Sequence, residues 1–253
     1  MTDLLEYPLA VFIVSALLQY LAAYLGYLFR TSRKRSSAER PSELATILGA
    51  ALTLLALIIG FSFSMAVSRY DQRKNYEEAE ANAIGTEYVR ADLLAAPEAS
   101  QVRDLLTRYA EQRVLFYEER NQERLRQIDA ETAKLQNNLW STVAGPATAQ
   151  PTPVVALAVA GANDVLNSRG YTQAAWWNRI PVGAWALMLL VALACNLLVG
   201  AGEEHKHRAA LSVLPLIVSI SMFLIADIDS PRSGVIRVAP QNLIALSHAL
   251  GSP

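Results

Sequence analysis

The sequence predicts an all-α membrane protein, with four transmembrane helices and a long helical extramembrane segment between helices 2 and 3. Three observations carry this prediction. Hydrophobic residues make up 53% of the 253 residues, only 18% are charged, and four long apolar stretches occur along the chain. Soluble domains average about 25% charged and about 45–50% apolar residues. The composition departs from these averages in both directions, as it does when part of a chain is solvated by lipid.

The four apolar stretches are long enough to cross a bilayer, whose hydrocarbon core of about 30 Å needs about 20 helical residues. The fourth is the shortest and contains Pro215, which membrane helices tolerate when neighbouring groups satisfy the freed carbonyl. The first resembles a signal peptide in position only, because acidic Asp3 and Glu6 precede it and its apolar run is too long. We therefore expect four uncleaved spans at residues 8–29, 44–68, 180–201 and 209–226.

The segment between the second and third spans is helical in character. Residues 69–95 contain no proline and are rich in helix-forming residues, so the second span is expected to continue as one rod until Pro97. Prolines within 145–153 predict a loop. Apolar residues recur at the spacing of a packed helix face at Val102, Leu105, Leu106, Tyr109 and Phe116.

These features divide the chain into four parts. Spans 1 and 2 with their short basic loop come first, followed by the helical extramembrane segment that continues helix 2. Spans 3 and 4 come next, and a turn with a short, strand-like C-terminal tail ends the chain. The expected boundaries are 1–68, 69–178, 179–228 and 229–253.

Cations in the short loops predict the orientation, because loops rich in Lys and Arg stay in the cytoplasm. The loop between spans 3 and 4 holds Lys206 and Arg208, and the first loop holds Arg30, Arg33, Lys34, Arg35 and Arg40. Both loops are therefore expected in the cytoplasm. The two termini and residues 69–178 are expected on the non-cytoplasmic side of the cell (inner) membrane.

Small and hydroxylated residues form a row along the second span. They are spaced by three or four positions, so they share one helix face. Such a row lets helices pack closely in lipid, which is its more common role. The alternative is that the row lines a narrow aqueous path for an inorganic ion. The candidate pore-lining residues are Gly49, Thr53, Ala56, Gly60, Ser64 and Ser68.

A polar cluster is expected where the second and fourth spans leave the membrane together. Small residues around Glu80 and Asn82 suit helix–helix contact, and these two polar groups would then need partners. The common exit permits carboxylate–guanidinium pairs. The alternative is a solvated helix with weak surface pairs. The cluster comprises Arg69, Asp71, Arg73, Glu80, Asn82, Arg90, Asp92, Asp227, Asp229 and Arg232.

No metal, cofactor or nucleic acid is expected as a partner. The net charge of −1 does not suit nucleic acid, and Cys195 is the only cysteine. The carboxylates of Asp227 and Asp229 fall short of the roughly 6–8 oxygen ligands that calcium takes. His205 and His207 are interpreted as part of a solvated loop. No catalytic motif is present, so an enzyme is not expected. A membrane enzyme would need a polar cleft that gathers Glu80, Asp92 and Asp229.

Residues 60–94 resemble the signature of the bestrophin-like domain family, whose members are largely uncharacterised membrane proteins. The resemblance rests on Gly60, Phe61, Ala66, Arg69, Asp71, Arg73, the 80–86 run, Arg90 and Asp92. A second matching stretch contains Asp227, Asp229, Pro231, Gly234 and Ile236. The resemblance covers nearly the whole chain.

The family name implies a more distant similarity to bestrophins, which are pentameric ion channels with the pore along the second membrane helix. Gly60-Phe61 and Arg69-Tyr70 resemble their pattern at the exit of that helix. The acidic calcium-binding run of animal bestrophins is reduced here to Asp227 and Asp229. Bestrophins also keep the long segment in the cytosol, whereas the cations of this chain predict the opposite side.

Two functions follow as hypotheses. The first is an oligomeric, bestrophin-like ion channel or channel-like protein in the lipid bilayer, with the second helix lining the path. The homo-oligomer would be a pentamer if it is truly bestrophin-like. The second is a non-conducting scaffold or sensor, whose charged helical segment at 111–134 binds a partner.

Overall fold

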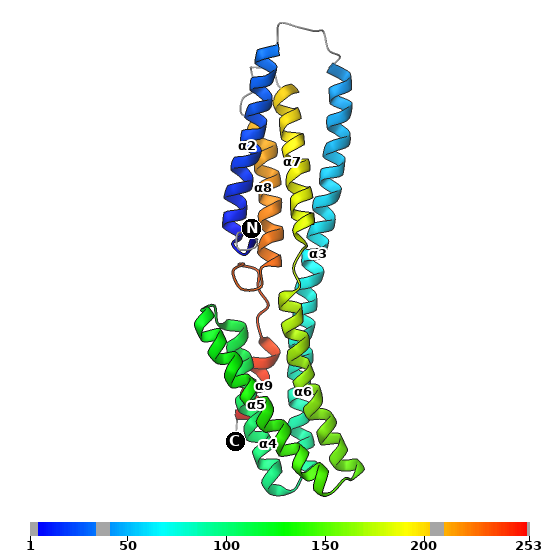
Figure 1. The fold of residues 1–253 in the computed structure, drawn as a ribbon, viewed down its shortest axis with the longest axis vertical. Coiled ribbons are helices and arrows are strands. Elements are labelled where there is room, and N and C mark those ends of the chain that lie inside the picture. The colour runs from blue at the N-terminus through cyan, green and yellow to red at the C-terminus, as the bar shows by residue number, and fades with distance from the viewer. Residues whose placement is uncertain (1–4, 34–40, 203–209, 252–253) are drawn as a thin grey trace. The chain divides into compact units, whose positions relative to one another are not determined.

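The computed structural model describes residues 5–33, 41–202 and 210–251 (Figure 1). Within these ranges the chain is helical with short connections and no strand, as the composition predicts. The helices are α2 (Pro8–Arg33), α3 (Pro41–Arg90), the 3₁₀ turn η1 (Ala91–Leu93), α4 (Ala96–Glu118), α5 (Gln122–Ala149), α6 (Pro153–Trp177), α7 (Val182–Gly202), α8 (Ala210–Asp229) and α9 (Gln241–Gly251).

Four helical segments are long and apolar enough to cross a membrane, and each overlaps one of the four predicted spans. They belong to α2, α3, α7 and α8. The 50 residues of α3 would extend about 75 Å, more than twice the thickness of a bilayer core of about 30 Å. Between Glu43 and Arg69 this helix carries no charged residue. The apolar first part of α3 is therefore the spanning part, and the rest lies outside the membrane.

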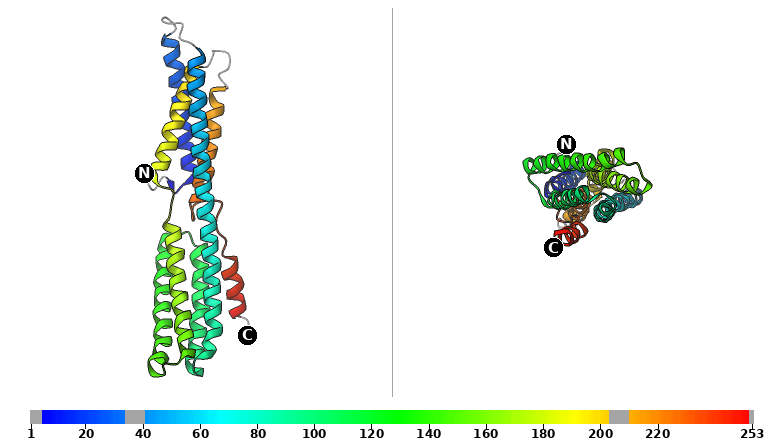
Figure 2. Two further views of the ribbon diagram at one scale, coloured as in Figure 1. Left: turned by 90° about the vertical axis from the view of Figure 1, so that its right-hand side faces the viewer. Right: turned by 90° about the horizontal axis from the view of Figure 1, so that it is seen from below.

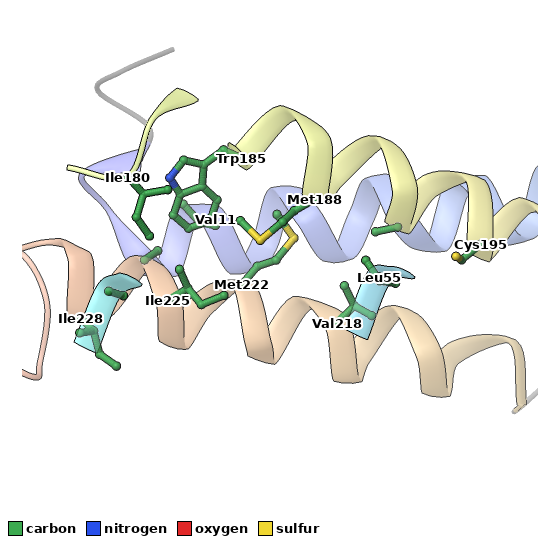
Figure 3. Close-up of a cluster of buried hydrophobic side chains, with 13 residues drawn as sticks. Val11, Leu55, Ile180, Trp185, Met188, Cys195, Val218, Met222, Ile225 and Ile228 are labelled. Atoms are coloured by element: carbon green, nitrogen blue, oxygen red, sulfur yellow. The ribbon is translucent and has the colours of Figure 1, made fainter. Parts of the chain in front are cut away.

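The chain forms two compact units. The membrane unit comprises residues 1–70 and 179–237, and the extramembrane unit comprises residues 71–178 and 238–253. In the membrane unit, α2 packs against both α7 and α8, as the two side views show (Figures 1 and 2). Figure 3 shows the core of this unit, where Met188 of α7 and Met222 of α8 meet beside Val11 of α2. Leu55 and Ala66 place the spanning part of α3 on the same core.

Two glycines allow the backbones of α2 and α7 to approach closely. A Cβ at Gly200 of α7 would fall on the carbonyl oxygen of Ala23, and a Cβ at Gly26 of α2 would fall on the carbonyl oxygen of Leu197. Only glycine fits at either position without moving one helix. This contact is the close small-residue packing expected between membrane helices.

The extramembrane unit is built from the second part of α3 together with α4, α5, α6 and α9. Helix α4 packs on α5 and α9, and α5 packs on α6. The apolar face predicted from residue 102 onward is buried, and Arg113 lies on it. Helix α9 begins where Glu77 of α3 accepts hydrogen bonds from the Leu243 N–H (2.9 Å) and the Asn242 side-chain amide (2.7 Å).

Three local expectations differ from the structure, and each difference has a physical cause. Helix α3 ends at Arg90, and Pro97 lies in the first turn of α4, where a missing N–H costs nothing. The loop predicted at 145–153 is shorter than expected and covers residues 150–152, because α5 continues through Pro146 to Ala149 and α6 begins at Pro153. The residue before this proline is Gly145, which has no Cβ to clash with the pyrrolidine ring, so the helix can continue.

The strand-like tail predicted after residue 234 is wrong. Residues 235–240 are bends and irregular chain, and α9 follows them. The Asp227 carboxylate accepts hydrogen bonds from the backbone N–H groups of Val235 (2.7 Å) and Ile236 (2.8 Å). In a strand these N–H groups would instead bond to a neighbouring strand. This part of the chain is therefore tied to the end of α8.

Candidate functional site

The row of small residues on α3 lies on the surface of the chain. All six predicted pore-lining positions are exposed, whereas Leu55, Ser62 and Ala66 on the opposite face are buried. A Cβ at Gly49 or at Gly60 would meet no described atom within 4 Å. The close contact between helices that such residues allow is made elsewhere in this chain, by Gly26 and Gly200. The exposed row is thus not packed against another helix in the described part of the chain.

One edge of this row borders an apolar groove between α3 and α8. The groove has a volume of about 520 Å³ and is lined from α3 by Ala56, Gly60 and Phe63 and from α8 mainly by Leu, Ile and Val side chains. Ser221 is its one hydroxyl-bearing side chain. The part of the groove lined by α8 is mainly apolar and suits a hydrocarbon chain or an apolar helix face.

The end of α8 is tied to two other segments of the membrane unit through Asp229. Its carboxylate accepts the backbone N–H of Ile180, just before α7, at 3.1 and 3.3 Å. The Arg69 guanidinium of α3 lies 3.7 Å from the same carboxylate. Because Asp229 is buried, these donors supply the compensation that a buried charge requires. The structure therefore places Arg69 and Asp229 together at the end of the spans.

The two aspartates at the end of α8 face N–H and guanidinium donors. Asp227 accepts two backbone N–H groups and Asp229 accepts a backbone N–H and pairs with Arg69. A calcium ion would need oxygen ligands in the positions that these N–H and guanidinium donors occupy. Within the described ranges no group of three or more His, Cys, Asp or Glu side chains could hold a metal ion. His205 and His207 lie outside the described residues.

In the extramembrane unit, Glu80 is part of a buried ion pair. The Arg113 Nε donates to Glu80 Oε1 at 2.6 Å, and Thr172 Oγ1 donates to Glu80 Oε2 at 3.1 Å. Glu80, Arg113 and Thr172 are almost fully buried. Burial lowers the pKa of Arg113, but the Glu80 carboxylate together with Tyr109 and Tyr117 outweighs burial, so the pKa of Arg113 is raised. This ion pair joins α3, α4 and α6.

The other predicted cluster residues are placed separately. Arg90 lies 4.0 Å from Asp164 of α6, and Asp92 pairs with Arg103 of α4. Glu80 and Asp92 thus have different cationic partners. Asp71 and Asn82 are exposed, Arg73 is buried, and Arg232 is partly buried.

Sequence reasoning did not identify Gln19 and Ser219, which form a buried polar network with Asn196 in the membrane unit. The Gln19 amide donates to Ser219 Oγ at 3.0 Å, and the Asn196 amide donates to Gln19 Oε1 at 3.1 Å. This network joins α2, α7 and α8. The sequence feature that indicates this network is Gln19, a lone amide side chain within an otherwise apolar first span.

Arg113, Glu77 and Glu87 were also missed as buried polar residues of the extramembrane unit. Arg113 lies four residues after Tyr109 and three before Phe116, so helical spacing placed it on the apolar face of α4. For Glu77 and Glu87 the charged composition of their segment gave no such indication.

Comparison with known proteins identifies the family and the fold. The sequence matches the Bestrophin-like domain over residues 11–243. No curated protein gives a significant match. A single-substitution variant of a bacterial bestrophin homologue from Klebsiella pneumoniae aligns with a TM-score of 0.65 at 14% identity, covering 94% of this chain and 97% of that one.

Two further solved structures agree with this alignment. The same bacterial homologue from Klebsiella pneumoniae, phased on zinc, gives a TM-score of 0.63 at 14% identity, with 94% and 95% of the two chains covered. A crystal structure described as a membrane protein gives 0.66 at 12% identity, with 94% and 97% covered. At these identities the likeness concerns the fold.

Proposed function

Because this chain belongs to the bestrophin-like domain family, we propose that it assembles into an oligomeric ion channel in which the first part of α3 lines the conducting path. The family and the four membrane-spanning helices make it a channel-like membrane protein. We propose three further points: the protein conducts ions, it assembles into an oligomer, and α3 lines the conducting path. A pentamer is the assembly that the similarity to bestrophins implies.

The observation that supports the proposal most is the exposure of the row on α3. A pore helix must turn its polar, small-residue face away from the packed core of its own subunit, toward a shared axis. On α3 this face carries the hydroxyls of Thr53, Ser64 and Ser68 and the glycines Gly49 and Gly60, all exposed. Exposed small residues and hydroxyls leave room for a hydrated ion and offer it hydrogen-bonding groups.

Conductance of the purified protein in planar bilayers tests the proposal. Ser64→Leu and Gly60→Leu should each lower the single-channel conductance, because each puts a bulky apolar side chain into the path. Gly183→Leu is the matched control, since Gly183 of α7 is also exposed with no atom near its Cβ position. Equal conductance of all variants, or no current with any of several salts, would contradict the proposal.

A second candidate, the non-conducting scaffold or sensor, is favoured by the charged surface of α5. The side chains of Arg124, Arg126 and Lys134 are 74%, 77% and 69% exposed. Their carboxylate partners Glu119, Glu123 and Glu131 lie on the same surface, so it suits a partner of mixed charge. A pore-free assembly with tightly packed α3 helices, together with loss of partner binding after Arg124→Glu and Arg126→Glu, would favour this function over conduction.

For the orientation, we propose that the extramembrane unit lies on the non-cytoplasmic side of the inner membrane. The support is the concentration of cations in the two short loops. Cations also occur at the opposite end of the spans, but Arg69 pairs with Asp229 there and Arg179 lies 3.8 Å from Glu6.

A further inference from the structure

Glu87 of α3 differs from every other buried carboxylate in the described part of the chain. Glu77, Glu80, Asp227 and Asp229 each accept at least one hydrogen bond from an N–H donor. Glu87 is 0% exposed, and neither of its carboxylate oxygens has a hydrogen-bond partner among the described residues. An ionised carboxylate in this position would lack the compensation that burial of a charge requires.

The Glu87 side chain forms part of the contact between α3 and α6. A Cβ at Gly161 of α6 would fall on Glu87 Oε2, and it would lie 2.9 Å from the Arg90 guanidinium. Gly161 is itself buried. The carboxyl group therefore packs directly against the α6 backbone, and the glycine makes the space that it occupies.

The charged groups around Glu87 do not supply a dedicated counter-ion. On its own helix, Arg90 lies 4.0 Å from Asp164 of α6 and is shared with that carboxylate. From α4, Arg103 pairs with Asp92 and lies over the ring of Tyr88. Burial raises the pKa of Glu87, Arg90 lowers it and Asp164 raises it, and the result is about 8.

We propose that Glu87 is a proton-binding site of the extramembrane unit: α3 and α6 pack together with this carboxyl protonated, and loss of the proton loosens their contact. The neutral acid fits against Gly161 without a counter-ion. The anion must gain water or a closer contact with Arg90 of the same helix, and water can reach it only if α6 moves away from α3. The site lies outside the apolar spanning part of α3, so the aqueous phase on its side of the membrane sets its protonation.

The direction of the pH dependence follows from proton linkage. The packed state holds the Glu87 proton up to about pH 8, whereas an ordinary carboxyl releases it near 4.5. Between these values the packed state binds more protons than the unfolded state, so stability falls as the pH rises. Below this pH range Glu87 does not lower the stability of the packed state. Above the range the loss of stability is complete and does not increase further.

Two measurements on the full-length protein in lipid nanodiscs test the proposal. Infrared spectra of protein with isotope-labelled glutamate should show a protonated-acid carbonyl band that titrates with a midpoint near pH 8 and is absent in Glu87→Gln. Spin labels at Asn82→Cys and Asn167→Cys, in a Cys195→Ala background, report the separation of α3 and α6. This separation should widen with the same midpoint in the otherwise native protein and stay constant in Glu87→Gln.

Glu78→Gln is the matched control, because Glu78 is an exposed carboxylate on the same helix. It should titrate and widen as the native protein does. Absence of the acid band at pH 6 would overturn the proposal, since Glu87 would then be ionised in the packed state. A band that titrates without any change in the label separation would overturn the proposed loosening. If Glu87→Gln does not fold, the native protein alone still gives both readouts.

Discussion

Three hydrogen-bonded buried carboxylates in the described part of the chain join segments that are distant in sequence. Glu80 of α3 binds Arg113 of α4, Glu77 binds the start of α9, and Asp229 binds the backbone before α7. Burial of a charge is costly unless donors compensate for it. These side chains therefore tie elements together only when the donors are in place, and removing one donor should cost more than an ordinary surface change.

Arg113→Leu should strongly destabilise the extramembrane unit. The Arg113 and Glu80 side chains are 1% and 0% exposed, so the substitution leaves a buried carboxylate without its main donor. Breaking a buried pair in this way costs about 3–5 kcal/mol. Chemical unfolding followed by tryptophan fluorescence would measure the loss, because Trp176 packs against Phe116 and Tyr117 of α4.

The matched control is Arg126→Leu, which removes an exposed pair with Glu123 and should change stability by about 0.5 kcal/mol or less. The double variant Arg113→Leu with Glu80→Leu should recover much of the loss, because no buried charge remains. Equal stability of Arg113→Leu and Arg126→Leu would contradict the role of this pair.

Sequence reasoning reached some of these residues and not others for a physical reason. Arg69 and Asp229 follow from the ends of two hydrophobic stretches, and hydropathy locates such ends well. Arg113 is different, because a charged residue in a polar helix is normally solvated. Its place on the apolar face of α4 was visible in the spacing, but the identity of its partner depended on how α3 packs.

Small residues have two different roles on the membrane helices. On α2 and α7, Gly26 and Gly200 face a neighbouring backbone, whereas the row on α3 is exposed. The local sequence pattern does not separate these cases, because spacing defines a helix face but not what lies opposite it. A row that either close packing or a pore could explain thus lies on the surface of the chain, and an isolated glycine pair makes the close contact.

Gly200→Ala should destabilise the membrane unit. The added methyl would occupy the position of the Ala23 carbonyl oxygen, and overpacking of this kind costs about 1–3 kcal/mol. The thermal unfolding midpoint in detergent would measure the effect.

Gly183→Ala on the same helix is the control, because nothing lies within 4 Å of its Cβ position. It should leave the midpoint unchanged or raise it slightly, since alanine favours a helix over glycine. If both variants lowered the midpoint equally, the close approach of α2 and α7 would not be the cause.

For the whole chain, hydropathy determines which segments meet lipid, and the two compact units follow the same division. The chain leaves the membrane unit within one continuous helix, α3, and its C-terminal residues return to the extramembrane unit as α9. The four spans were predictable for this reason. Helix α9 was not, because its attachment depends on Glu77, 165 residues from Asn242.

The proposed orientation has a direct test in cysteine accessibility. In a Cys195→Ala background, Arg126→Cys should react with a membrane-impermeant maleimide in intact spheroplasts, because this side chain is 77% exposed. Arg35→Cys, in the first short loop, should react only after permeabilisation. The reverse labelling pattern would place the extramembrane unit in the cytosol, as in bestrophins, and would contradict the orientation inferred from the cations.

Local composition decided the class of this protein: apolar stretches of bilayer length make four spans, and stretches rich in helix-forming residues make most of the remaining helices. These properties depend only on neighbours in the chain and on the solvent. Which carboxylate meets which cation, which glycine faces a backbone and which helix face stays open depended on the packing of distant segments. Such pairings are set by contacts such as Glu80 with Arg113 and Gly200 with Ala23, which only the assembled fold creates.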